Sequence, residues 1–110
     1  MKPFNRYKIQ TYCPKDVADT VRLAIGEAGG GKLGNYSYCA WITEGQGYFL
    51  PLEGADPTIG SVGKMEQVKE VKIEFICEES KVKQVIEAIK KVHPYEEVPI
   101  DVIQLMDFHP

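Results

Sequence analysis

The densest group of reactive side chains is the run His93-Pro94-Tyr95-Glu96-Glu97. A histidine beside a carboxylate can ligate a divalent metal or form an acid–base pair, so His93 and Glu96 are candidate metal ligands. Alternatively, His93 stabilises the C-terminus of a helix, and Pro94 begins a rigid turn into the next strand. Both interpretations remain open at this point. No other cofactor is indicated.

The run Gly29-Gly30-Gly31-Lys32-Leu33-Gly34 is similar to a phosphate-binding loop. Such a loop follows a strand and precedes a helix, however, whereas here the predicted order is the reverse. A helix-ending glycine cluster is therefore favoured, although its backbone amides could bind an anion. The residues that we predict to bind a ligand are Gly34, Tyr36, His93 and Tyr95.

Aromatic residues gather in the middle of the chain. Trp41, Tyr48 and Phe49 could stack on nucleic-acid bases, but no basic residues are interleaved with them. We therefore predict that these three residues form an oligomer interface. The order and spacing of serine, histidine and acidic residues fit no nucleophilic triad, so no catalytic residue is predicted.

Hydrophobic periodicity predicts the elements that position these residues. Strands are expected at residues 7–13, 37–43, 47–50, 71–77 and 98–105, with a turn or bulge at 44–47. Helices are expected from about residue 14 to 28 and from 78 to 93, and residues 51–65 are expected to be irregular. A partial repeat, in which residues 7–13 align with 71–77, supports two strand–helix halves.

This order predicts an α+β, ferredoxin-like βαββαβ sandwich, with an antiparallel sheet and two helices on one face. The strands at 7–13 and 71–77 should be central and adjacent. Residues 1–110 are expected to form one domain, with flexible ends at 1–5 and 107–110.

The formal net charge is −3, and charges alternate in sign along the predicted helices. This balance argues against nucleic acid and against a membrane as partners. The three cysteines, Cys13, Cys39 and Cys77, are far apart and form no metal-binding pair. Free thiols in a reducing cytoplasm are the simplest expectation.

Several strings together resemble a known domain. They lie at residues 34–39, 45–51, 54–60, 62–66 and 93–99. In this order they resemble the inserted domain of the Nif-three family, which is similar to the PII and CutA proteins. The resemblance implies a PII/CutA-like fold and assembly into trimers. It also implies that the family's dinuclear metal site lies in flanking segments, so none of its residues can be placed on this sequence.

These observations predict a non-catalytic, oligomeric binding or regulatory module whose ligand is unknown. A homo-oligomer is expected, because an apolar strand at a sheet edge needs cover. The resemblance to PII and CutA proteins favours a trimer over a dimer. A small molecule or another protein is the expected partner. The alternative is a metal-binding protein or metal-dependent enzyme that uses His93 and Glu96.

Overall fold

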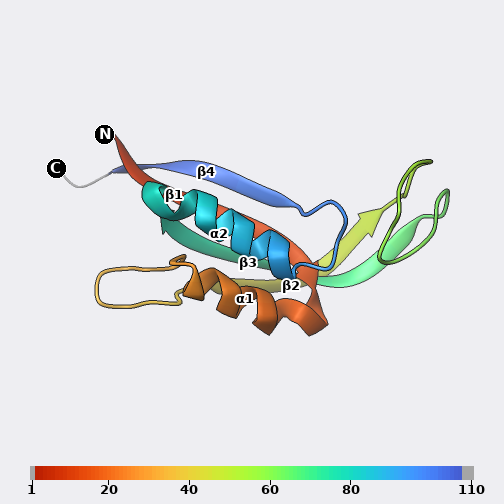
Figure 1. Ribbon diagram of the computed structural model, residues 1–110, viewed down its shortest axis with the longest axis horizontal. Helices are drawn as coiled ribbons and strands as arrows, with labels where there is room; N and C mark the ends of the chain where they lie inside the picture. The colour runs from red at the N-terminus through yellow and green to blue at the C-terminus, as the bar shows by residue number, and fades with distance from the viewer. Residues whose placement is uncertain (1, 108–110) are drawn as a thin grey trace.

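The computed structural model describes residues 2–107 and contains four strands and two α-helices (Figure 1). Along the chain these are β1 (Lys2–Pro14), a 3₁₀ turn η1 (Lys15–Val17), α1 (Ala18–Glu27), β2 (Trp41–Phe49), β3 (Glu66–Glu78), α2 (Glu79–Val92) and β4 (Ile100–Asp107). The predicted βαββαβ order is therefore confirmed. No helix within residues 2–107 is long and apolar enough to cross a membrane.

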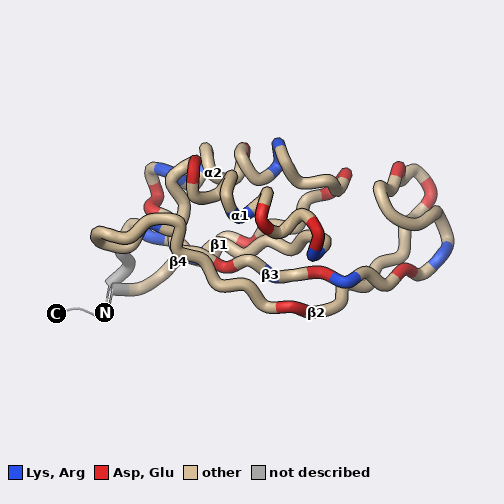
Figure 2. Tube along the Cα trace, turned by 90° about the horizontal axis from the view of Figure 1, so that it is seen from below, with Lys and Arg blue, Asp and Glu red and all other residues tan. Residues whose placement is uncertain are grey.

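The strands form one antiparallel sheet in the order β2-β3-β1-β4. As predicted, β1 and β3 are central and adjacent. Both helices cover the same face of the sheet, which Figure 2 shows in side view. The opposite face carries no helix, and we call it the open face. The edges of the sheet are β2 and β4.

The core lies between the helices and the covered face. Alternation in β1 and β3 sends every second side chain into this layer, and each helix adds one apolar stripe. The buried apolar residues are Ile9, Cys13, Val21, Ile25, Val71, Ile73, Phe75, Cys77, Val85 and Ile89. Thr11 is buried among them, and its hydroxyl donates a hydrogen bond of 2.9 Å to the carbonyl oxygen of Pro99. Burial of this polar group is therefore compensated.

The expected interruption at residues 44–47 is absent, because β2 runs unbroken from Trp41 to Phe49. It pairs with β3 in constant register, from Trp41 opposite Glu74 to Phe49 opposite Glu66. The continuous ladder along the longer β3 keeps the glycines of this stretch extended. Residues 37–40 precede the strand rather than belonging to it.

The chain ends also differ from expectation. Residues 2–5, which we predicted to be flexible, belong to β1, where Lys2 and Pro3 pair with Asp107 and Met106. Asp107 is thus also in a strand, and the remaining predicted flexible positions, residues 1 and 108–110, lie outside the described part of the chain.

The predicted helix ends are close to those observed. The first helical turn after Pro14 is the 3₁₀ turn η1, and α1 begins only at Ala18. Gly29 and Gly31 adopt φ angles of 102° and 78° after α1, as expected for glycines that terminate a helix. The helix-cap interpretation of this run therefore agrees with the structure.

The cysteines are separated by the sheet register. Cys13 pairs with Val71 and Cys77 pairs with Tyr7, so the two cysteines are six positions apart along β3. At about 3.3 Å per residue this separates them by about 20 Å.

A candidate binding cleft at one end of the sheet

A cleft of about 470 Å³ lies where β2 and β3 extend beyond the end of β1. Its other walls are the segment that follows β2 and the connection from α2 to β4, which Figure 1 shows at the same end of the molecule. We call it the Tyr95 cleft. Its lining consists of Tyr12, Gly47, Tyr48, Phe49, Leu50, Pro51, Ala55, Pro57, Thr58, Ile59, Glu70, Tyr95, Glu96, Glu97, Val98 and Pro99.

Hydrogen bonds join the two loops that form its walls. The Thr58 hydroxyl donates to the carbonyl oxygen of Pro94 at 2.6 Å, and the Asp56 amide donates to Oε2 of Glu96 at 3.1 Å. The irregular segment at 51–65 is closed on itself by a bond of 2.9 Å from the Gly63 amide to the Pro51 carbonyl. These bonds give the cleft defined walls although both are loops.

Tyr95 is the central side chain of the cleft. Its hydroxyl donates to Oε2 of Glu70 at 2.5 Å, and its ring centroid is 6.4 Å from that of Phe49. Burial raises the pKa of Tyr95 strongly, and the hydrogen bond and negative charge of Glu70 raise it further. The phenol therefore stays a proton donor over the physiological pH range, which fixes the Glu70 carboxylate.

Gly47 makes room for that carboxylate. A Cβ atom placed on Gly47 would overlap Oε1 of Glu70, so any other residue at this position would displace the acid. Gly47 thus leaves space in β2 that the Glu70 carboxylate occupies. The sequence pattern alone did not single out Glu70, because it belongs to an ordinary alternation of charged and apolar residues along β3.

The His93 side chain stabilises the end of α2 through groups outside that helix and not through the helix carbonyls. It is the C-cap of α2 with an extended backbone, and its side chain is buried. Nε2 lies 2.6 Å from the carbonyl oxygen of Tyr12, and Nδ1 accepts the Tyr95 amide at 3.1 Å. Because a carbonyl only accepts, the proton belongs on Nε2. The ring therefore ties the end of α2 to β1 and to the turn after it.

The two candidate metal ligands have other partners in this arrangement. Both ring nitrogens of His93 are engaged, and Glu96 accepts the Asp56 amide. Metal ligation by His93 would require breaking one of its two bonds. Within residues 2–107 no group of three or more histidine, cysteine or acidic side chains is placed to hold a metal ion.

The four predicted ligand-binding residues divide between opposite ends of the sheet. Tyr95 lines the Tyr95 cleft and His93 lies just before it at the end of α2, whereas Gly34 and Tyr36 lie in the connection from α1 to β2 at the other end (Figure 1). There, Leu33 and Tyr36 form a two-bond bridge around Gly34, whose φ is 56°. Within one chain, these two pairs do not line a common site.

The three predicted interface residues all lie on the edge strand β2, but in different surroundings. Trp41 and Tyr48 are 70% and 65% exposed. Phe49 is only partly exposed and packs near Tyr95. Tyr48 and Phe49 also line the Tyr95 cleft, so the cleft reaches the exposed edge of the sheet.

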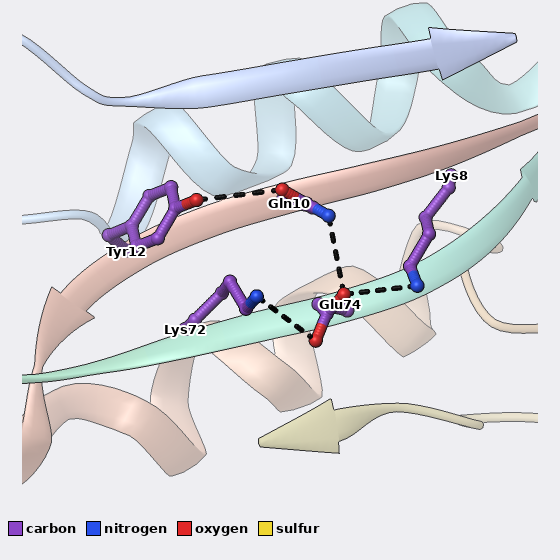
Figure 3. A network of polar contacts seen from close by, with 5 residues as sticks. All are labelled: Lys8, Gln10, Tyr12, Lys72 and Glu74. Atoms are coloured by element: carbon purple, nitrogen blue, oxygen red, sulfur yellow. Dashed lines mark hydrogen bonds and ion pairs between the residues drawn. The ribbon is translucent and has the colours of Figure 1, made fainter. Parts of the chain in front are cut away.

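A polar network occupies the centre of the open face (Figure 3). Glu74 contacts the ammonium groups of Lys8 at 3.0 Å and Lys72 at 3.5 Å, and accepts a hydrogen bond from Gln10 at 3.2 Å. Gln10 in turn accepts the Tyr12 hydroxyl at 3.5 Å. The hydrogen bond from Lys8 is the main cause that lowers the pKa of Glu74. The network extends to Tyr12, which also lines the cleft.

Comparison with known proteins identifies relatives of this chain. A Bacillus subtilis protein named GTP cyclohydrolase 1 type 2 homolog is 50% identical over 95 residues, which are 86% of this chain and 26% of that protein. A Bacillus cereus protein related to NIF3 superposes with a TM-score of 0.81 at 41% identity, covering 96% of this chain and 27% of the other. The chain therefore spans about a quarter of the length of these relatives. No protein-family model matches it.

More distant structures share the fold. CutA1 from a psychrotrophic Shewanella species superposes with a TM-score of 0.70 at 19% identity, over 99% of this chain and 88% of the other. GlnK of Bacillus subtilis gives a TM-score of 0.62 at 16% identity, over 91% and 81% of the two chains. The predicted PII/CutA-like, ferredoxin-like fold is confirmed.

Proposed function

The chain is homologous to one segment of NIF3-family proteins, and we propose that it acts as a non-catalytic, homo-oligomeric binding or regulatory module. One observation carries the proposal. The last residues of the exposed edge strand β2, Tyr48 and Phe49, are also walls of the Tyr95 cleft. Assembly along this edge would therefore place the cleft beside a subunit interface.

The edge strand supports the oligomeric part of the proposal. Only one side of β2 is paired, and its large aromatic side chains Trp41 and Tyr48 are exposed. An exposed aromatic edge is a template for association unless it is covered. Contact with a second copy of the chain would cover it. We favour a trimer over a dimer because of the resemblance to PII and CutA proteins.

The cleft supports the binding part. Its volume lies within the range typical of small-molecule sites, and its walls are mostly apolar with a few oriented polar groups. A ligand bound there would contact both the edge strand and the loop after α2. It could therefore change how subunits fit together, which is a basis for regulation.

The cyclohydrolase that the relatives' name mentions stays outside this proposal, since this chain covers about a quarter of their length. We also propose that the module functions in the cytoplasm, a placement supported by its cysteines, whose spacing fits no disulfide framework.

Light scattering at micromolar concentration tests the assembly. We expect a mass three times that of the 12.4 kDa chain. Trp41→Glu should lower this mass, because it puts a charge into the proposed interface. Leu23→Glu is the matched control, since Leu23 is also exposed but belongs to α1 rather than to β2, and its substitution should leave the mass unchanged. A wild-type mass equal to one chain would refute the oligomeric module.

A further inference from the structure

The charge distribution of the Tyr95 cleft is one-sided. Three carboxylates, those of Glu70, Glu96 and Glu97, contribute to its lining. Among the lining residues, all of which the structure describes, there is no lysine, arginine or histidine. A small ligand in this cleft thus encounters negative charge without a compensating protein cation. Such a site disfavours anions and favours a positively charged group.

The position of the Glu70 carboxylate is fixed before any ligand arrives. Tyr95 donates to one of its oxygens at 2.5 Å, and Gly47 leaves space for the other. A carboxylate held in this way needs little reordering to accept a donor from a ligand. Glu70 and Tyr95 are both half-buried, so the carboxylate is only partly exposed to solvent.

The aromatic walls distinguish an organic cation from a metal ion. The rings of Tyr48, Phe49 and Tyr95 all line the cleft, and the faces of such rings attract ammonium and guanidinium groups. A bare divalent ion instead requires several oxygen or nitrogen donors around one point. The described residues hold no group of three or more histidine, cysteine or acidic side chains placed to bind such an ion.

From these observations we propose that the Tyr95 cleft binds a small organic cation, an amine or amidine with an apolar or aromatic body. The positive group meets Glu70 at the end of the sheet, and the apolar body packs between Phe49 and the loop at 50–59. This inference rests on the proposed binding function and adds the chemical class of the ligand to it.

Three probes of the same shape and different charge test the inference: benzamidinium, benzamide and benzoate. Each is titrated at pH 7 into the full chain, and amide NMR signals are followed. We expect benzamidinium to shift the signals of Gly47 and Tyr95 and to bind at least about tenfold more tightly than benzamide. Benzoate should produce no shift at these positions. Raising the salt concentration should weaken only the cation.

Three variants test which carboxylate the cation contacts. Glu70→Gln keeps a group that can accept the Tyr95 hydroxyl and should weaken benzamidinium binding about tenfold, to the level of benzamide. Glu53→Gln is the control, because Glu53 is exposed on the same loop region but does not line the cleft. Its affinity should equal that of the wild type. Tyr95→Phe, which keeps the ring, should give an intermediate loss.

Equal binding of benzamidinium and benzamide, or stronger binding of benzoate, would overturn the inference. So would benzamidinium shifts confined to residues outside the cleft, or unchanged affinity in Glu70→Gln. These outcomes are independent of the molecular mass. A trimer that binds none of the three probes would refute the cation site but not the oligomeric module. A monomer that binds benzamidinium would refute the oligomeric module but not the cation site.

Discussion

The two faces of β1 differ although they belong to one strand. Ile9, Thr11 and Cys13 point into the layer under the helices and are buried. Lys8 and Gln10, which alternate with them, belong to the polar network of the open face. The covered face is thus occupied by the protein's own helices. The open face carries no helix, and at its end Tyr12 lines the Tyr95 cleft. The covered face therefore supplies the core, and the proposed binding cleft lies at the end of the open face.

The largest expected difference between the faces comes from truncating one isoleucine on each. Ile73→Ala on the covered face of β3 should lower the free energy of unfolding by about 2–5 kcal/mol, since Ile73 is fully buried. Ile103→Ala on the open side of β4 should cost less than about 1 kcal/mol, because that side chain is 45% exposed. Urea unfolding at fixed protein concentration measures both. Equal losses would contradict the assignment of the core to one face.

Thiol reactivity sharpens the same comparison. Burial, with smaller contributions from Glu70 and Asp16, raises the pKa of Cys13 to about 11. At pH 8 its thiolate should be about 100-fold rarer than that of an unperturbed thiol, so alkylation should be slower by at least that factor in native than in urea-unfolded protein. Mass spectrometry of timed iodoacetamide reactions measures the two rates. Fast native labelling of Cys13 would place it outside the core.

The raised pKa of Cys13 also makes the stability of the protein depend on pH. A thiol whose pKa is raised by folding contributes stability that is intact below pH 9 and is lost as the pH rises toward 11. We expect the wild type to become less stable over this interval and Cys13→Ala to show a shallower decline.

A smaller effect is expected at the junction between α2 and the cleft. His93→Gln should destabilise the protein by about 1–3 kcal/mol, because a carboxamide carries its donor and acceptor on one terminal group and cannot hold the Tyr12 carbonyl and the Tyr95 amide together as the two ring nitrogens do. Lys91→Gln, an exposed change in the last turn of α2, is the control and should cost less than about 0.5 kcal/mol. Thermal melts distinguish the two. A zinc-dependent rise in melting temperature that His93→Gln abolishes would instead support the metal-site hypothesis.

The smallest effect concerns the centre of the open face. The bond from Lys8 lowers the pKa of Glu74, so this pair contributes stability that is present above the usual pKa of a glutamate and is lost as the pH falls below it. Glu74→Gln should slightly flatten the decline in melting temperature between about pH 5 and pH 3 relative to the wild type, whereas Glu53→Gln should not. A larger effect from Glu53→Gln would show that the network of Figure 3 is energetically unimportant.

The elements and their order could be predicted from the sequence because they depend on local periodicity. Apolar residues at three- and four-residue spacing indicated both helices, and the partial repeat between residues 7–13 and 71–77 indicated β1 and β3. The prediction was wrong where a partner strand decided the outcome. Gly45 and Gly47 suggested a turn, but pairing with β3 keeps them extended, and the carboxylate of Glu70 explains the absence of a side chain at Gly47.

Only part of the candidate site could be predicted from the sequence. The run at 93–97 was recognisable because several reactive side chains are adjacent, and Tyr95 does line the cleft. Its partner Glu70 lies 25 positions earlier in the chain, in a strand whose charge pattern looks ordinary. Gly34 and Tyr36 were grouped with Tyr95 although the crossover through α1 places them at the far end of the sheet.

By itself the sequence predicted the βαββαβ order and the resemblance to NIF3-family proteins, since both depend on pattern along the chain. The tertiary structure decided which side chains meet. The cleft forms because β1 ends at Pro14 while β2 and β3 continue past it. Contacts between positions distant in sequence depend on register and on where strands end, and no local pattern specifies either.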